Sequence, residues 1–252
     1  METLIEKLLA HFFNWINLKT IVLNLFDKFP EIIAIMSERK DGSMKLFRNS
    51  NLNLENRKNF FKNNEIKKVI AAEIVHSNKV KIVDEESSEL ILGVDGLVTR
   101  SEKLFLSVTV ADCIPVYFYA PQEKIVALAH CGWRGIVDGI IENMFNKILQ
   151  LGGKAENLQV ALGPGINQCH FEIKADVLNQ FENYSEFVIE AEGKIFIDLK
   201  GIIQEQLVSL GIKGKNIQDN KECTVENNEK YFSFRRDNPE KVEAMVAIIG
   251  MR

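Results

Sequence analysis

The sequence predicts an α+β fold, in which a single domain of layered mixed β-sheets is covered by helices. Its 252 residues are 46% hydrophobic and 26% charged, as in an ordinary globular protein. Runs with strand and helix patterns alternate without a regular βαβ rhythm, and no GxGxxG motif joins a strand to a helix, which argues against a Rossmann fold. No repeat or Pro/Gly-rich linker divides the chain, so we expect one domain.

The N-terminal residues 1–27 are expected to form a helical extension, and residues 28–252 the domain. Apolar residues recur in the extension at helical spacing, at Leu4, Leu8, Phe12 and Ile16. Its uncharged run, residues 8–18, is shorter than the about 20 apolar residues that a membrane span requires. We therefore expect an amphipathic surface helix and no membrane association.

The next segments predict mainly strands. EIIAIMSE (31–38) predicts a strand, which a charged turn around Gly42 follows. NRKNFFKNNE (56–65) predicts a polar helix, and KVIAAEIVHSNKVKIV (68–83) predicts two strands with His76 at the break between them. Three short β-rich runs come next, at 104–110, 115–120 and 124–130.

The last 120 residues mix both patterns. Apolar residues every four positions, at Ile136, Ile140, Met144 and Ile148, predict a helix from about Ile136 to Leu151-Gly152-Gly153. The later predictions are a strand at 159–163, a helix at 174–183, a hairpin at 187–199, a helix at 202–210 and strands at 231–237 and 242–250.

Charge and cysteine usage exclude two classes. The 31 basic and 35 acidic residues are interleaved and give a net charge of −4, so we expect no nucleic-acid binding. Four cysteines lie far apart without a CxxC pair, at Cys113, Cys131, Cys169 and Cys223. We therefore expect no disulfide framework and a reducing, cytoplasmic location. The sequence does not indicate an oligomeric state.

Three side chains that can bind metal fall at the ends of neighbouring predicted strands: His76, Cys113 and His130. Two histidines and one cysteine, with a fourth position left for water, have the composition of a catalytic zinc site. Copper could use the same ligands. Cys131 should face the opposite way from His130 if the strand continues that far.

The segment HCGWRG (130–135) adds an arginine between two glycines. Arg134 and the start of the following helix could receive an anion at the same edge. Alternatively, the glycines only permit a turn, Trp133 fills the core and Arg134 forms an ordinary salt bridge. The pattern leaves both interpretations open.

Several motifs together resemble a known family. TVADCIPV, HCGWRG, IVHSNKV, VDGLVT, CT and YFSFRRD have the order and approximate spacing of the purine nucleoside phosphorylase family with a laccase domain, historically described as multicopper polyphenol oxidases. The resemblance covers roughly residues 28–250. It implies one layered domain with a metal site, in which His76, Cys113 and His130 are the zinc ligands.

The resemblance also implies an activity. The family is associated with phosphorolysis of adenosine, inosine and S-methyl-5'-thioadenosine and with adenosine deamination, so purine nucleosides and phosphate are the expected partners. Matching motif to motif adds Arg39, Asn53 and Arg57 to Arg134 as substrate-binding residues, and Arg134 joins the three metal ligands as a catalytic residue.

The sequence departs from the family pattern at several places, including a shortened turn after Arg39 and Asn167 in place of a usual glycine. Ile74 stands where the family usually has glutamine, which affects the expected substrate range. Cys169 and His170 are additional, and their adjacency raises a second metal site. Because neighbours in a strand face opposite sides, the sequence argues against that site.

Other functions remain open at this stage. Copper-dependent oxidation of phenols would need more imidazoles than the four histidines of this chain. Cys113 and His130 could instead form a metal-free cysteine hydrolase, because a thiolate beside a histidine is a nucleophile. The protein could also bind zinc without catalysis. The HxE and PCxxC signature of zinc nucleobase deaminases is absent, so any deamination needs a different architecture.

Overall fold

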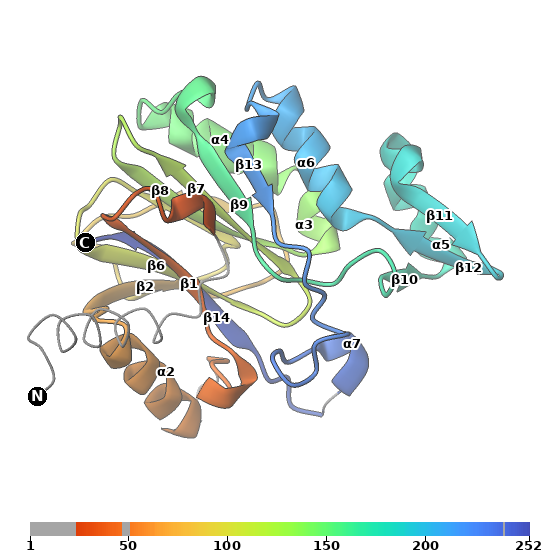
Figure 1. Ribbon diagram of the computed structural model, residues 1–252, viewed down its shortest axis with the longest axis horizontal. Helices are drawn as coiled ribbons and strands as arrows, with labels where there is room; N and C mark the ends of the chain where they lie inside the picture. The colour runs from red at the N-terminus through yellow and green to blue at the C-terminus, as the bar shows by residue number, and fades with distance from the viewer. Residues whose placement is uncertain (1–23, 47–50, 239) are drawn as a thin grey trace, which may run out of the picture.

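The computed structural model describes residues 24–46, 51–238 and 240–252, and within these ranges the strands form three sheets (Figure 1). Most of the expected N-terminal extension, residues 1–23, lies outside the described residues. The first sheet comprises, in order, β1 (Ile32–Met36), β14 (Met245–Met251), β6 (Leu104–Val110), β2 (Lys68–Ala72) and β4 (Leu90–Ile91). The second comprises β13 (Ile217–Asp219), β9 (Gln159–Leu162), β7 (Ile114–Ala120), β8 (Ile125–Cys131), β5 (Gly96–Thr99) and β3 (Val80–Ile82).

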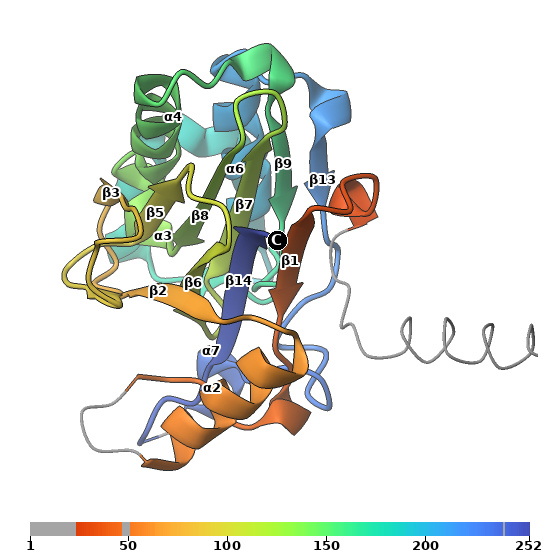
Figure 2. The ribbon, with the colours of Figure 1, turned by 90° about the vertical axis from the view of Figure 1, so that its left-hand side faces the viewer.

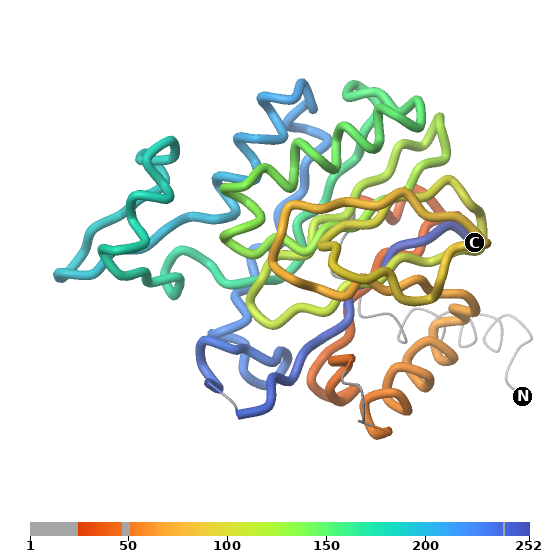
Figure 3. Tube along the Cα trace, turned by 180° about the vertical axis from the view of Figure 1, so that it is seen from behind, coloured from red at the N-terminus to blue at the C-terminus, as the bar shows by residue number. Residues whose placement is uncertain are grey.

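The two larger sheets pack face to face between helices, as Figures 1 and 2 show. The outer face of the five-stranded sheet carries α2 (Asn51–Asn63), and that of the six-stranded sheet carries α3 (Trp133–Val137), α4 (Ile140–Gln150) and α6 (Leu199–Ser209). A small sheet of β10 (Glu172–Ile173), β12 (Lys194–Ile197) and β11 (Val188–Ala191) projects to one side with α5 (Ala175–Leu178) (Figure 3). These layers confirm the predicted α+β class.

The strands alternate between two cores although they are buried throughout. In β7, Tyr117 and Tyr119 face the core between the two sheets, whereas Val116 and Phe118 face the core beneath the helices. Every residue of β7 and β8 is buried, which explains why their sequences are continuously apolar. No helix in the described ranges is long and apolar enough to cross a membrane.

The helix expected from about Ile136 is two helices. α3 already begins at Trp133, and a break at Asp138-Gly139 separates it from α4. Gly139 has φ +87°, a left-handed conformation that cannot continue a right-handed helix. The earlier start places Arg134 inside the first turn of α3.

The segment YFSFRRD is not a strand, contrary to the prediction. Residues Phe234–Asp237 form the short helix α7, whose N-cap Ser233 accepts a hydrogen bond from the backbone N–H of Arg236. Aromatic residues at alternating positions produced a strand pattern, but the serine in that pattern is a helix cap. The segment predicted as a helix at 174–183 is also shorter, because α5 gives way to a 3-10 helix, Asn179–Phe187.

Candidate metal centre

The predicted ligands meet where β7 begins and β8 ends, at one end of the inner strands of the six-stranded sheet. Cys113 precedes β7, His130 lies near the end of β8, and His76 lies in the loop between β2 and β3. Because β7 and β8 are antiparallel and Pro115 pairs with His130, the start of one strand meets the end of the other. One ligand atom from each of the three residues lies within 4.8 Å of the other two, and the imidazole centroids are 4.9 Å apart.

A buried carboxylate that the sequence analysis missed organises these ligands. Asp95 is fully buried and lies 2.9 Å from Nδ1 of His130, which leaves Nε2 as the nitrogen available for a metal. The same carboxylate accepts hydrogen bonds from the backbone N–H groups of His76 (2.9 Å) and Ser77 (2.7 Å). Asp95 therefore fixes two of the three ligands. Its signal was present in the VDGLVT motif, where it is the acidic residue.

Backbone conformation also marks the site. His76 has φ +59° and Asp112, which precedes Cys113, has φ +82°. Such left-handed conformations cost about 1–3 kcal/mol in a non-glycine residue and persist where surrounding contacts enforce them. The Asp112 carboxylate accepts hydrogen bonds from Oγ1 of Thr224 and the backbone N–H of Arg235, both at 2.6 Å. These bonds attach the Cys113 turn to α7 and to the segment before it.

The charges in the centre favour a thiolate. Burial alone would raise the pKa of the Cys113 thiol, but His130 and His76 beside it lower that pKa below its ordinary value. Burial alone would lower the pKa of His130, but Cys113 and Asp95 raise it above that of a free imidazole. A thiolate between two imidazoles is a donor set that suits zinc or copper.

Cys131 differs from Cys113 in the direction of its side chain and in the pKa of its thiol. As strand alternation predicts, it faces the core beneath the helices, where it is fully buried. Burial raises the pKa of its thiol well above the ordinary value. It is therefore a packed apolar side chain and contributes no ligand to this group.

The candidate centre opens into a cavity of about 460 Å³. Its lining includes three aromatic side chains, Trp133, Phe171 and Phe234, and three cationic side chains, Lys45, Arg134 and Arg235. A cavity of this size, with apolar walls and a few polar groups, is typical of a small-molecule site. A second cavity adjoins it and shares Lys45, Ile74 and Thr109.

Arg134 is exposed and lies over the Trp133 ring, with its guanidinium carbon 4.4 Å from the ring centroid. It forms no ion pair with any residue in the described ranges. The alternative interpretation, in which Arg134 forms an ordinary salt bridge, therefore finds no partner among those residues. Because α3 has only five residues, its dipole adds little to anion binding. Any anion at this position would depend mainly on the guanidinium itself.

The other expected substrate-binding residues lie outside the described lining of this cavity. Arg39 pairs with Asp237 at 2.8 Å, and Asn53 donates a hydrogen bond to the carbonyl of Lys45 at 2.8 Å. Arg57 is buried, donates to the carbonyl of Met44 and lines the adjoining cavity. Asn53 and Arg57 thus hold the segment that presents Lys45. The sequence analysis did not select four further lining residues, because they belong to three segments that only the fold brings together: Lys45, Phe171, Phe234 and Arg235.

The expectation that Cys169 and His170 face opposite sides is wrong. They lie in a turn rather than a strand, and alternation does not apply there. Their ligand atoms converge with those of Cys223 and Glu226, all within 4.8 Å of one another.

Gly132 leaves the space into which the three ligands project. Its φ of −80° is open to any residue, but a Cβ there would lie 3.1 Å from Sγ of Cys113 and 3.5 Å from Cδ2 of His76. We therefore expect Gly132→Ala to weaken metal binding by crowding the ligands. Competition with a chromogenic chelator would measure the affinity. The exposed Gly214, whose added Cβ has open space, gives the control Gly214→Ala, and equal affinities in both variants would contradict this role.

Comparison with known proteins shows the family of this chain. Residues 49–252 match the family model described as multi-copper polyphenol oxidoreductase laccase. Similar curated proteins include adenosine deaminase RL5 of an unknown prokaryotic organism, 33% identical over 64% of this chain and 67% of the relative. They also include a purine nucleoside phosphorylase of Staphylococcus epidermidis, 34% identical over 71% of this chain and 68% of the relative.

A solved structure shares the fold. The crystal structure of the hypothetical protein YfiH of Bacillus licheniformis is 25% identical, with a TM-score of 0.81 and coverage of 90% of this chain and 94% of that chain. The family model spans most of the chain described above, including all three predicted ligands. The chain therefore belongs to the multi-copper polyphenol oxidoreductase laccase family, whose curated relatives carry the names purine nucleoside phosphorylase and adenosine deaminase.

Proposed function

We propose that this protein is a zinc-dependent purine nucleoside enzyme. It would phosphorolyse adenosine, inosine and S-methyl-5'-thioadenosine to the free base and the ribose or methylthioribose 1-phosphate, and it would deaminate adenosine. The observation that carries the proposal is that the three-ligand group, three cations and three aromatic side chains line one cavity. The names of the curated relatives support the nucleoside class.

The cavity wall suits the two parts of a nucleoside reaction. Trp133, Phe171 and Phe234 offer apolar surface for a flat purine base. Arg134 can bind phosphate by two parallel hydrogen bonds through its planar guanidinium, and Lys45 and Arg235 add positive charge. Phosphate held beside the ribose would attack the anomeric carbon as the bond to the base nitrogen breaks.

The metal ligands suit an open site. His76, Cys113 and His130 supply three donors, and Asp95 holds His130 with Nδ1 engaged and Nε2 free. When bound there, zinc supplies a Lewis acid that lowers the pKa of water toward about 7, the chemistry that deamination requires. The chain's own residues position the base, exclude bulk water from it and neutralise the phosphate.

The two other enzyme classes have less support. Only two imidazoles meet Cys113 in the described residues, fewer than a multicopper oxidation site needs, although copper could occupy the same ligands. A cysteine hydrolase would use Cys113 with His130, but a second imidazole on the same thiol favours metal binding.

One assay separates these functions. We expect protein incubated with adenosine and phosphate to release adenine and ribose 1-phosphate, and to release inosine with or without phosphate. Chromatography of the products measures both reactions, and inosine and S-methyl-5'-thioadenosine are tested in the same way. Absence of all three products, with zinc bound, would contradict the proposal and favour a protein that binds zinc without catalysis.

Arg134→Ala should keep the bound zinc but weaken phosphorolysis more than deamination, because phosphate is a substrate of the first reaction only. We expect a raised KM for phosphate, by about 10- to 100-fold for the loss of a charge-assisted bidentate contact worth roughly 1.5–3 kcal/mol. Arg134→Lys should restore only part of the affinity, since an ammonium lacks the planar fork. Rates measured against phosphate concentration test this, and an unchanged phosphate dependence would make Arg134 a structural residue.

A further inference from the structure

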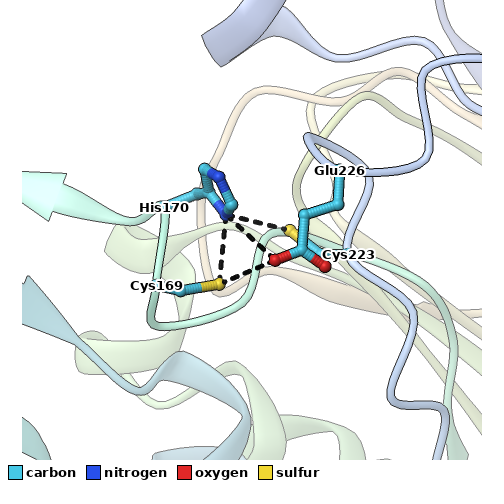
Figure 4. A group of neighbouring side chains, drawn as sticks. All are labelled: Cys169, His170, Cys223 and Glu226. Atoms are coloured by element: carbon cyan, nitrogen blue, oxygen red, sulfur yellow. Dashed lines mark hydrogen bonds and ion pairs between the residues drawn. The ribbon is translucent and has the colours of Figure 1, made fainter.

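We propose that Cys169, His170, Cys223 and Glu226 form a second zinc site, which shares no ligand with the group of His76, Cys113 and His130. Figure 4 shows the four side chains pointing toward one another. Cys169 and His170 come from the turn that follows β9, and Cys223 and Glu226 come from the segment between β13 and α7. Two loops distant in sequence thus contribute two ligands each.

The distances fit a tetrahedral zinc ion. Zinc–sulfur and zinc–nitrogen or zinc–oxygen bonds of about 2.3 and 2.0 Å place neighbouring tetrahedral ligands about 3.3 to 3.8 Å apart. Nδ1 of His170 lies 3.0 Å from Sγ of Cys169, 3.7 Å from Sγ of Cys223 and 3.7 Å from Oε1 of Glu226. Sγ of Cys169 lies 3.4 Å from the same carboxylate oxygen. One ion can therefore reach all four atoms with small side-chain adjustments.

The donors also have the chemistry of a closed site. Two cysteines, which lose their protons when they bind the ion, an imidazole and a carboxylate would fill all four zinc positions. Four protein ligands are typical of a structural ion, whereas the first centre has three donors. The backbone N–H of Asn167 donates a hydrogen bond to Sγ of Cys223 at 3.4 Å, an outer contact that stabilises a thiolate ligand. Cys223 is fully buried, but Glu226 is 54% exposed, so zinc can enter without unfolding.

The position of the site indicates what it would stabilise. The carbonyl of His170 accepts a hydrogen bond from Nη1 of Arg235 at 2.8 Å, and Phe171, the next residue, lines the main cavity. Thr224, next to Cys223, is the residue that donates to Asp112 beside the first centre. Zinc between these loops would therefore fix one wall of the main cavity.

Metal content tests the proposal. Protein prepared under reducing conditions and saturated with zinc should hold two zinc ions per chain. The double variant Cys169→Ser/His170→Asn should hold one, because both changes remove ligands on an accessible turn. Glu226→Gln should bind the second ion more weakly, whereas the control Glu229→Gln, an exposed glutamate three positions on, should behave as the unchanged protein.

Replacement of zinc by cobalt shows which of the two sites has lost its ion. The sulfur-to-cobalt charge-transfer absorbance should fall in the double variant from the value for three thiolate ligands to the value for one. The remaining band should disappear when Cys113→Ala is added to the double variant. Circular dichroism of the double variant confirms that it folds. A single zinc per chain that Cys113→Ala removes, or two zinc ions in the double variant, would overturn the second site. Either result would leave the nucleoside assay unaffected, so failure of one proposal is distinguishable from failure of the other.

Discussion

Replacing Cys113 by alanine is expected to remove the zinc ion of the first centre and to abolish turnover of purine nucleosides, whereas Cys131→Ala keeps both. Cys113 is the thiolate between His76 and His130, and the two imidazoles alone hold zinc weakly. Cys131 faces the apolar core, so its replacement leaves a small cavity that costs about 1–2 kcal/mol of unfolding free energy. Zinc content per chain, adenosine turnover and urea unfolding measure the three effects.

The two variants control each other. Each removes one cysteine sulfur atom, from Cys113 just before β7 or from Cys131 at the end of β8, where Cys131 pairs with Ile114. Equal loss of zinc in both would show that the wrong cysteine has been chosen as a ligand. Activity of Cys113→Ala without zinc would instead exclude metal-dependent chemistry at this group.

The sequence predicted the strands around the centre well because they carry local signals. The runs at 104–110, 115–120 and 124–130 are rich in apolar, β-branched and aromatic residues, and the structure confirms all three within one residue. The α3–α4 break was missed because Gly139 sits within an apolar helical pattern that continues on both sides of it. The spacing of apolar residues indicates which face of a helix is buried, but it does not indicate the backbone φ of Gly139.

The convergence of the three predicted ligands could also be predicted from local strand signals. His76, Cys113 and His130 follow or precede strands that were themselves predictable, and antiparallel pairing brings their ends together. Asp95 also precedes a strand, in the VDGLVT motif, but its role depends on donors from residues 75–77 and from His130 that only the fold places around it. Buried polar partners of this kind are set by tertiary contacts.

The second cluster shows the opposite error. Cys169 and His170 were judged by strand alternation, but they lie in a turn. Their partner Cys223 is 53 residues away from His170, and no periodicity connects the two segments. Adjacency in sequence alone therefore could not establish or exclude a shared ion.

Asp95→Asn should weaken zinc binding at the first centre by about 10- to 100-fold, the usual effect of losing a carboxylate behind a ligating histidine. Oδ1 of Asp95 accepts from the backbone N–H of His76 and contacts Nδ1 of His130, and Oδ2 accepts from the N–H and hydroxyl of Ser77. In asparagine, an NH₂ group replaces one of these two oxygens and cannot accept a hydrogen bond. The buried donors that face that position therefore lose their acceptor. Each unsatisfied buried donor costs about 1–3 kcal/mol, and the metal-free protein should be less stable by a similar amount.

Two measurements separate the effects of this change. Chelator competition gives the zinc affinity, and urea unfolding of the metal-free protein gives the stability. Asp176→Asn, an exposed aspartate in α5, is the matched control and should change neither. Because Asp95 fixes both the nitrogen that His130 presents and the left-handed backbone of His76, affinity should fall even where the protein stays folded. An Asp95→Asn protein with unchanged zinc affinity would show that packing alone orients the two histidines, and the carboxylate would then serve only to satisfy the buried backbone of the loop that carries His76.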